Sequence, residues 1–253
     1  MCHTFLGENP AFAIPPVSHT SSILYLLVIP GAGLAALAGV GFQKATLAWR
    51  AKIKRIKRVP LFLKGAVGAL INWVLGIAVF FWIAKIGVFG LGYGDLETML
   101  NGGITGPQAT ILVIAKLAAT TAVYAWGGVG GIFSPTLFFG AAIGLVFGDL
   151  CGLGLNLEPS DRIALTVAGM SACFGAVVRA PITSILIVFE MTHQFSFVPF
   201  LMIGTIASQA VSRSLCRTDF YNGVIQQDGV KLERYLSSPT VPSLQSRPIS
   251  SPD

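Results

Sequence analysis

The chain has 253 residues, of which 53% are hydrophobic and only 11% are charged. A soluble domain carries about 25% charged residues, so this composition excludes an ordinary soluble protein and predicts an all-α membrane protein that crosses the bilayer several times. The net charge of +6 is not the signature of a nucleic-acid partner, and six of the 17 basic residues lie in one short run. That run comprises Arg50, Lys52, Lys54, Arg55, Lys57 and Arg58.

The first half of the chain contains three apolar segments. Residues 1–20 hold several prolines and no continuous apolar stretch, so we expect an extramembrane connector there rather than a secretory signal. Residues 22–49 and 61–91 are each long enough to span a hydrocarbon core of about 30 Å, and 108–126 form the third segment. The positive-inside rule places the basic run between the first two segments in the cytoplasm; calmodulin or lipid binding is the alternative. Residues 92–106 are expected to form a loop or a short surface helix.

The second half of the chain is predicted to contain shorter and broken helices. They are expected over residues 132–150, 162–178, 181–191 and 196–213. The third of them is too short to cross a bilayer. Short helices among full spans indicate a channel or transporter fold with broken and re-entrant helices. Three glycines, at intervals of four residues along the first of these helices, predict a close helix–helix contact. They are Gly140, Gly144 and Gly148.

Polar residues mark the borders of this region. Ser160 or Asp161 is predicted to be the N-cap of the helix over 162–178, because short polar side chains satisfy free backbone N–H groups. The apolar segments together define a transmembrane domain over 21–216. Residues 236–253 are rich in serine and proline and are predicted to be a polar tail, which the basic residues nearby place in the cytoplasm.

The most informative stretch is residues 127–135, GGVGGIFSP, between two apolar segments. Glycines leave the backbone uncovered, and Pro135 suits the first turn of a new helix. We therefore predict a helix N-terminus at membrane depth, where free N–H groups and the positive end of the helix dipole form an anion site. Gly130, Gly131 and Ser134 complete the backbone loop of this site. A tight helix–helix crossing is the alternative explanation of the glycines.

No motif of an enzyme is present in the sequence. The chain has no phosphate-binding loop, no zinc-protease motif and no nucleophile elbow. Its four cysteines are isolated and its three histidines lack the spacing of metal ligands. We therefore predict no catalytic activity, no metal and no cofactor.

Three motifs resemble the CLC family of chloride channels and chloride/proton antiporters. Residues 131–140, GIFSPTLFFG, are similar to its G-x-F-x-P signature, and 178–192 contain the VRAPIT and FEMT of its second hallmark. Residues 219–222, DFYN, lie where the family places its pore tyrosine. The motifs follow the family's order and spacing across residues 20–235. The resemblance implies a CLC-type fold in which residues 217–235 form the final pore helix.

The resemblance also implies roles for individual residues. The backbone N–H groups of Ile132 and Phe133 would bind chloride, the substrate, and the hydroxyl of Tyr221 would donate a further hydrogen bond. Plain packing is the alternative for the Phe133 side chain, which would otherwise line the pore, and an interfacial anchor is the alternative for Tyr221. Lys116 is expected in a buried structural pairing, with a place near the ion path as the alternative. Arg179 is expected to bind backbone carbonyls.

The resemblance covers only the second of the two inverted halves of the family. The G-S-G-x-P and G-R/K-E-G-P segments, which supply a serine and the gating glutamate, have no match. The chain is therefore expected to be a fragment with half of the anion site, to require a first half, and not to conduct alone. A homodimer is implied for the intact protein, while channel and antiporter both stay open. The competing hypotheses are an inert fragment and a membrane assembly subunit that binds a separate first-half partner.

Overall fold

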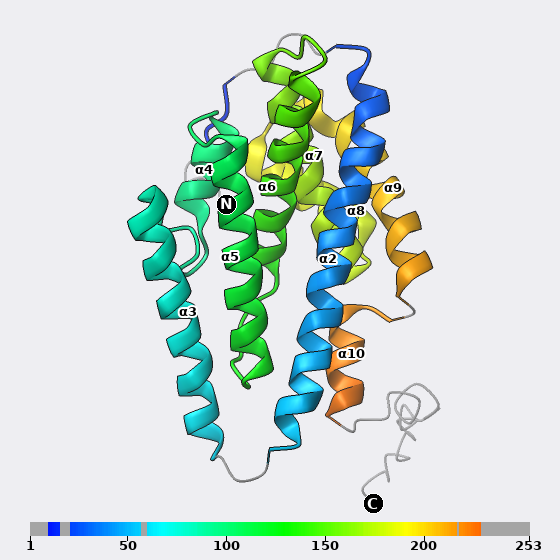
Figure 1. The fold of residues 1–253 in the computed structure, drawn as a ribbon. Helices are drawn as coiled ribbons and strands as arrows, with labels where there is room; N and C mark the ends of the chain where they lie inside the picture. The colour runs from blue at the N-terminus through cyan, green and yellow to red at the C-terminus, as the bar shows by residue number, and fades with distance from the viewer. Residues whose placement is uncertain (1–9, 16–20, 57–59, 217, 229–253) are drawn as a thin grey trace, which may run out of the picture.

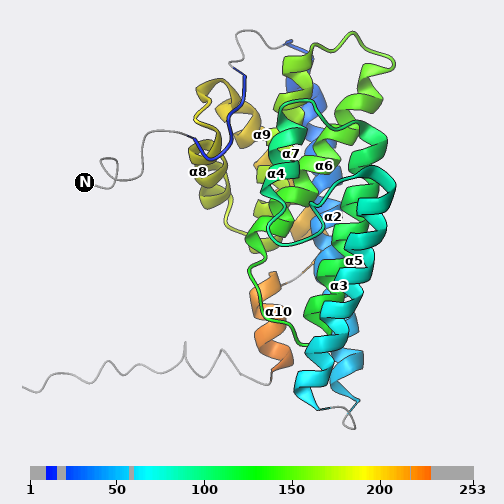
Figure 2. The same cartoon turned by 90° about the vertical axis from the view of Figure 1, so that its left-hand side faces the viewer.

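The computed structural model describes residues 10–15, 21–56, 60–216 and 218–228. These residues form helices and connecting loops without a strand, and six of the helical segments are long and apolar enough to cross a membrane. The prediction of an all-α, multi-pass membrane protein is therefore confirmed. The helices stand roughly side by side in one bundle, with the shorter helices α4, α8 and α10 around it (Figures 1 and 2).

Helix α2 (Leu24–Lys54) and helix α3 (Leu61–Ile83) lie on either side of helix α5 (Gly106–Ala125) (Figure 1). Helix α3 ends earlier than the apolar segment of 61–91 predicted, because Ala84 adopts a left-handed conformation with φ 52°. The chain then forms a loop that leads into helix α4 (Tyr93–Leu100). This short helix is one of the two alternatives predicted for residues 92–106.

Helix α6 (Phe133–Gly152) and helix α7 (Pro159–Val178) form the centre of the bundle. The predicted glycine contact is confirmed there. A Cβ on Gly140 would lie 2.1 Å from the carbonyl oxygen of Gly169, and a Cβ on Gly144 would lie 2.3 Å from that of Leu165. The two backbones are thus in direct contact, as small residues permit between membrane helices.

The N-cap predicted for α7 is wrong. Glu158, not Ser160 or Asp161, occupies that position with an extended backbone, and Pro159 is the first helical residue. Proline favours the first helical position, because its fixed φ suits a helix and its missing N–H would have no partner there. Asp161 instead accepts a hydrogen bond from the Glu158 N–H at 3.3 Å, as the third residue of a capping box.

Three elements follow α7 along the chain before the last helix. Helix α8 (Pro181–Thr192) is the short helix predicted after the break, and η1 (Phe195–Phe197) leads into helix α9 (Val198–Leu215). The break itself contains Arg179, which has φ 61° and donates to the carbonyl oxygen of Cys216. The expected binding of a backbone carbonyl by this arginine is therefore found.

Helix α10 (Phe220–Gln227) lies beside the lower part of α2 in Figure 1. Within the expected pore helix of 217–235, helical structure is described only for these eight residues. Residues 229–235 and the predicted tail of 236–253 lie outside the described residues. The Gln227 side chain donates to the carbonyl oxygen of Leu47 at 2.8 Å, and Lys54 donates to Asp228, which follows the helix.

The carboxylate of Asp228 gives this contact a pH dependence. Hydrogen bonds from Lys54 and Arg50 hold the pKa of Asp228 below its ordinary value. At pH values above the ordinary carboxyl pKa, the charged carboxylate therefore stabilises the packing of α10 on α2. This stabilisation is lost as the pH falls through the lowered pKa. We expect Asp228→Asn to destabilise α10 by less than about 1 kcal/mol near neutral pH, because the pair is exposed.

Hydrogen exchange of the backbone amides of α10 measures this effect. The variant and the unchanged chain should differ near neutral pH and should coincide in strong acid, where Asp228 is protonated in both states. A difference that persists undiminished in strong acid would show that the effect does not arise from the carboxylate charge.

Candidate anion site

The predicted helix break lies in the loop between α5 and α6. Gly127 has φ 92°, which favours glycine, and a Cβ on Gly128 would lie 2.5 Å from the Val123 side chain. Neither reason applies to Gly130 and Gly131. A Cβ on Gly130 would make only an ordinary contact of 3.6 Å with the Tyr124 hydroxyl, and nothing lies within 4 Å of a Cβ on Gly131. Backbone conformation and packing therefore account for the first two glycines, whereas the last two leave the backbone uncovered.

Helix α6 begins directly after this bare backbone. Its N-cap is Ile132, and no side chain caps the helix. Within the described part of the chain, the backbone N–H groups of Ile132 and Phe133 donate to no other residue. The positive end of a helix of 20 residues thus presents free donors here, which is the local structure of an anion site.

Ile132 and Tyr221 line the same cavity, which we call the tyrosine cavity and which has a volume of about 280 Å³. Ile132 is buried, whereas Tyr221 lies in the first turn of α10 and is 49% exposed. The structure therefore brings these two predicted residues to one space. The cavity is lined by Thr46, Arg50, Tyr124, Gly128, Val129, Gly130, Ile132, Phe220, Tyr221, Val224, Ile225 and Asp228.

The other predicted residues of the loop lie elsewhere. Gly131, Ser134 and Pro135 line a second cavity of about 250 Å³, which lies between α3, the loop before α4, α5 and the start of α6 and also reaches Gly130. The Ser134 hydroxyl donates to the carbonyl oxygen of Leu91 at 2.5 Å.

The Phe133 ring packs edge-on against Phe174 at 5.2 Å and belongs to neither of these cavities. For this side chain, the packing alternative agrees with the structure, while the backbone N–H keeps the position described above.

Tyr124 is a site residue that the sequence analysis missed. Its hydroxyl donates to the carbonyl oxygen of Gly130, and its ring lies edge-on to Phe220 at 5.7 Å. It lines both cavities, so it stands between them at the glycine loop. The only signal in the sequence is its position just before the loop, at the end of α5.

Lys116 has the buried structural role that was expected. It is 1% exposed, and its ammonium donates to the carbonyl oxygens of Gly87 at 2.5 Å and Gly90 at 3.2 Å. The same nitrogen lies 4.9 Å from the ring centre of Phe138 on α6. Asp95 on α4 accepts a hydrogen bond from the N–H of Gly87 at 2.5 Å. The loop before α4 is therefore held by side chains of α4, α5 and α6.

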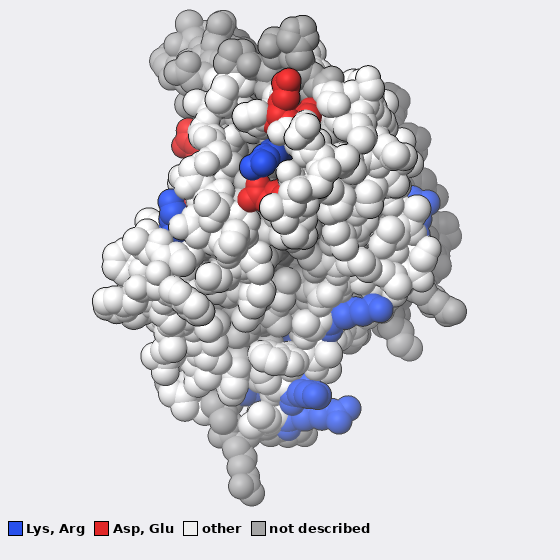
Figure 3. All heavy atoms as spheres, turned by 45° about the horizontal axis from the view of Figure 1, so that its top comes forward, with Lys and Arg blue, Asp and Glu red and all other residues white. Residues whose placement is uncertain are grey.

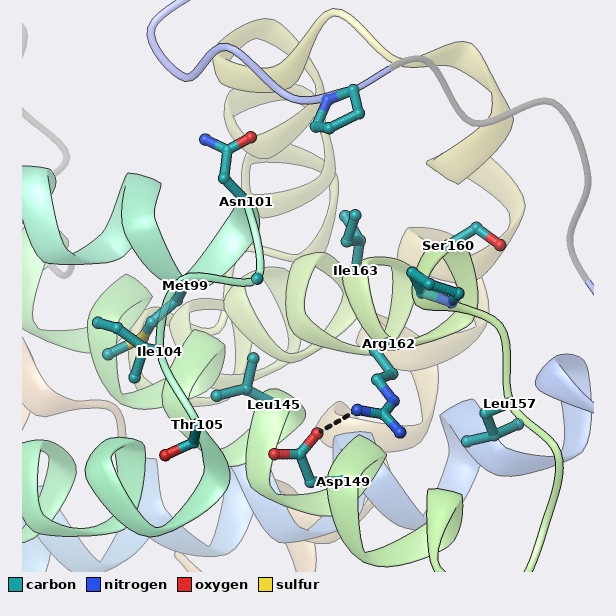
Figure 4. Close-up of a pocket in the computed structure, with 13 residues that line it drawn as sticks. Met99, Asn101, Ile104, Thr105, Leu145, Asp149, Leu157, Ser160, Arg162 and Ile163 are labelled. Carbon is teal, nitrogen blue, oxygen red and sulfur yellow. Dashed lines mark hydrogen bonds and ion pairs between the residues drawn. The ribbon is translucent and has the colours of Figure 1, made fainter.

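A larger cavity of about 550 Å³ lies at the other end of the bundle (Figure 4). Arg162 and Asp149 point toward each other inside it and form an ion pair at 3.1 Å. The second carboxylate oxygen of Asp149 accepts the N–H of Gly106 at 2.7 Å. Because both carboxylate oxygens have partners, we assign this pair to the packing of α5, α6 and α7. Among the described residues, no three metal-ligating side chains lie together.

Comparison with known proteins identifies the family. The sequence model of the family described as voltage gated chloride channel matches residues 1–213. A putative chloride channel protein ClcB-like of Ralstonia nicotianae is 32% identical over 211 residues, which cover 83% of this chain and 47% of that protein. The voltage-gated ClC-type chloride channel ClcB of Escherichia coli O81 is 32% identical over 201 residues, 78% of this chain and 46% of that protein.

Solved structures agree with this result at the level of the fold. A slow cyanobacterial Cl⁻/H⁺ antiporter superposes with a TM-score of 0.74 at 20% identity, over 94% of this chain and 53% of that chain. A CLC-type fluoride/proton antiporter gives a TM-score of 0.67 at 21% identity, over 87% and 51%. The chain thus spans about half the length of the relatives it matches. It belongs to the voltage-gated chloride channel family, the CLC family, whose members are channels and transporters rather than enzymes.

Proposed function

We propose that this chain supplies one half of the anion site of a CLC-type chloride channel or chloride/proton antiporter. The observation that carries the proposal is the tyrosine cavity, where the uncapped start of α6 and the side chain of Tyr221 line one space. The names of the relatives, which describe chloride channels, support chloride as the substrate.

The chemistry of this site suits an ion that must bind and leave. The N–H groups of Ile132 and Phe133 and the hydroxyl of Tyr221 would replace part of the water around chloride. None of these donors carries a full charge, so none would form a tight ion pair with the ion. Gly130, Gly131, Ser134 and Pro135 would keep the backbone uncovered and begin the helix. The site needs no cofactor for this task.

The proposal includes the partners and the orientation of the chain. A first half would complete the anion site, and the intact protein would be a homodimer. In Figure 3, one basic side chain lies among the acidic ones on the upper part of the face, and others lie at its sides and toward its lower edge. The end of α2 carries Arg50, Lys52, Lys54 and Arg55. By the positive-inside rule, these residues support a cytoplasmic position for the α2–α3 loop and for the C-terminal end of the chain, because α10 lies at the same end of the bundle.

Chloride titration of the purified chain tests the site. We expect Tyr221→Phe to weaken chloride binding about tenfold, because a hydrogen bond to a charged group contributes about 1.5 kcal/mol or more. Tyr25→Phe is the matched control, since Tyr25 lies on α2 against Phe200 and outside the tyrosine cavity. Equal affinities of the two variants would contradict the role of Tyr221.

Chloride efflux from liposomes separates this proposal from its alternatives. The chain alone should give no efflux above empty liposomes but should still bind chloride. Absence of both efflux and binding would favour the alternative, a non-conducting fragment or an assembly subunit that needs a separate first-half partner. Efflux that Tyr221→Phe alters would show that copies of this chain assemble a complete pore.

A further inference from the structure

Tyr124, at the end of α5, contacts both the loop before α6 and the helix that carries Tyr221. Its hydroxyl donates a hydrogen bond to the carbonyl oxygen of Gly130, and its ring lies edge-on to that of Phe220. Phe220 comes directly before Tyr221 in the first turn of α10. One side chain therefore contacts the two segments that supply the donors of the candidate anion site.

The hydrogen bond from Tyr124 sets the orientation of one peptide unit. The described residues contain no cis peptide bond, and in a trans peptide the carbonyl group and the following N–H point in opposite directions. Because Tyr124 holds the carbonyl of Gly130, the N–H of Gly131 points away from the tyrosine. Nothing in the described part of the chain accepts a hydrogen bond from this N–H. The tyrosine thus directs the backbone that leads into the free N–H groups of Ile132 and Phe133.

The loop has few other bonds that could hold it in this orientation. The N–H of Gly128 still donates to α5, and the next backbone N–H along the chain that donates to a carbonyl is that of Thr136, inside α6. Residues 129–131, between these two, are exposed. Among the described residues, their hydrogen bonding consists of the contact with the Tyr124 hydroxyl.

The ring of Tyr124 belongs to an aromatic cluster from three helices. Phe42 of α2 stacks on Phe220 of α10 with ring centres 5.6 Å apart, and both of these rings are buried. Tyr124 lies edge-on to Phe42 at 6.3 Å and to Phe220 at 5.7 Å. Packing therefore fixes the ring, and the ring in turn places the hydroxyl for a directed bond to the loop.

We infer that Tyr124 is a positioning residue of the candidate anion site, which holds the start of α6 and the start of α10 at one cavity. A tyrosine hydroxyl has one proton, and Tyr124 uses it on Gly130, so it acts on the ion through the backbone rather than by contact. Donors that are fixed beforehand bind a ligand more tightly, because no ordering cost is left for the binding step. The inference rests on the proposed chloride function and adds to it a residue outside the set of ion donors.

NMR of glycine amides during a chloride titration of the full-length purified chain tests this inference. The sequence contains three Gly–Gly pairs, which end at Gly103, Gly128 and Gly131. In a chain labelled with ¹⁵N and carbonyl-¹³C glycine, only these three amide nitrogens are bonded to a labelled carbonyl. Gly103 and Gly128 each donate to a backbone carbonyl at 2.8 Å and serve as internal controls. We expect chloride to shift the signal of Gly131 more than those of the controls.

Tyr124→Phe removes the hydroxyl but keeps the ring in its cluster. We expect chloride affinity to fall about fivefold, as for the loss of one hydrogen bond, and the chloride-dependent shift of Gly131 to shrink. Phe220→Leu should also weaken chloride binding but should leave the Gly131 signal of the chloride-free chain in place, because the hydroxyl bond remains. Tyr93→Phe is the matched control, since Tyr93 also lies edge-on to a phenylalanine but lines neither cavity.

The results separate this inference from the proposed function. If Tyr221→Phe weakens chloride binding while Tyr124→Phe behaves like Tyr93→Phe, the positioning role is refuted and the proposed function stands. A Tyr124→Phe chain that unfolds at a lower temperature but keeps its chloride affinity and its Gly131 shift would also refute the role, because the hydroxyl would then serve stability alone. If the unchanged chain binds no chloride, the proposed function fails and the inference fails with it.

Discussion

Gly140→Ala is expected to be among the most damaging changes in this chain, although it adds a single methyl group. The new Cβ would lie 2.1 Å from the carbonyl oxygen of Gly169 and 2.8 Å from the Cβ of Cys173. The first of these atoms belongs to the backbone of α7, so no side-chain rotation relieves the clash. We expect a loss of about 3 kcal/mol or more, at or above the upper end for overpacking.

Thermal unfolding in detergent measures this loss, and the chain offers a matched control. Gly41 also lies inside a helix, on α2, and has nothing within 4 Å of an added Cβ. Gly41→Ala should stabilise its helix by about 0.5–1 kcal/mol, because alanine is the better helix former. A Gly140→Ala chain that melts together with the Gly41→Ala chain would refute the backbone contact between α6 and α7.

Lys116→Met is the second change with a large expected effect. Methionine keeps most of the length of the side chain but leaves the carbonyl oxygens of Gly87 and Gly90 without their donor. The loss of a charged donor by these two acceptors, of which that of Gly87 is buried, costs about 3 kcal/mol in total. The loop they belong to also contains Leu91, which accepts the hydroxyl of Ser134 at the start of α6.

Two measurements distinguish the local effect of Lys116→Met from a general one. Unfolding should occur at a lower temperature, and chloride affinity should fall, because the start of α6 loses a support. Lys85→Met removes the same charge from a partly exposed residue just beyond α3 and should change neither quantity strongly. A stable Lys116→Met chain with normal unfolding would mean that the loop holds its shape without the ammonium.

Much of the fold was predictable, because membrane helices are long apolar runs and their breaks are marked by glycine and proline. The boundaries were less predictable. The apolar run of 61–91 continues past the end of α3, because the apolar residues after Ala84, such as the buried Val88, belong to a loop rather than to a helix. The cap of α7 was missed because a glutamate before Pro159 fulfilled the role assigned to Ser160 or Asp161.

Some residues of the candidate site could be predicted from the sequence and others could not. Its backbone could be located from the local pattern of residues 127–135, and Tyr221 could be located from the family motif. Thr46, Arg50 and Tyr124 carried no such pattern. They line the cavity only because α2, α5 and α10 pack together. No local pattern in the sequence predicts this packing.

The contact between α6 and α7 has a mechanical consequence for any ion that binds here. Two helices whose main chains touch at Gly140 and Gly169 cannot slide or rotate past each other without collision. The N–H groups at the start of α6 are therefore a fixed reference point. Helix α10, which carries Tyr221, is joined to α2 by the stacked rings of Phe220 and Phe42 and by polar groups at its end. If the proposed chloride function holds, this short helix is the wall of the tyrosine cavity that we expect to move when the site opens or closes.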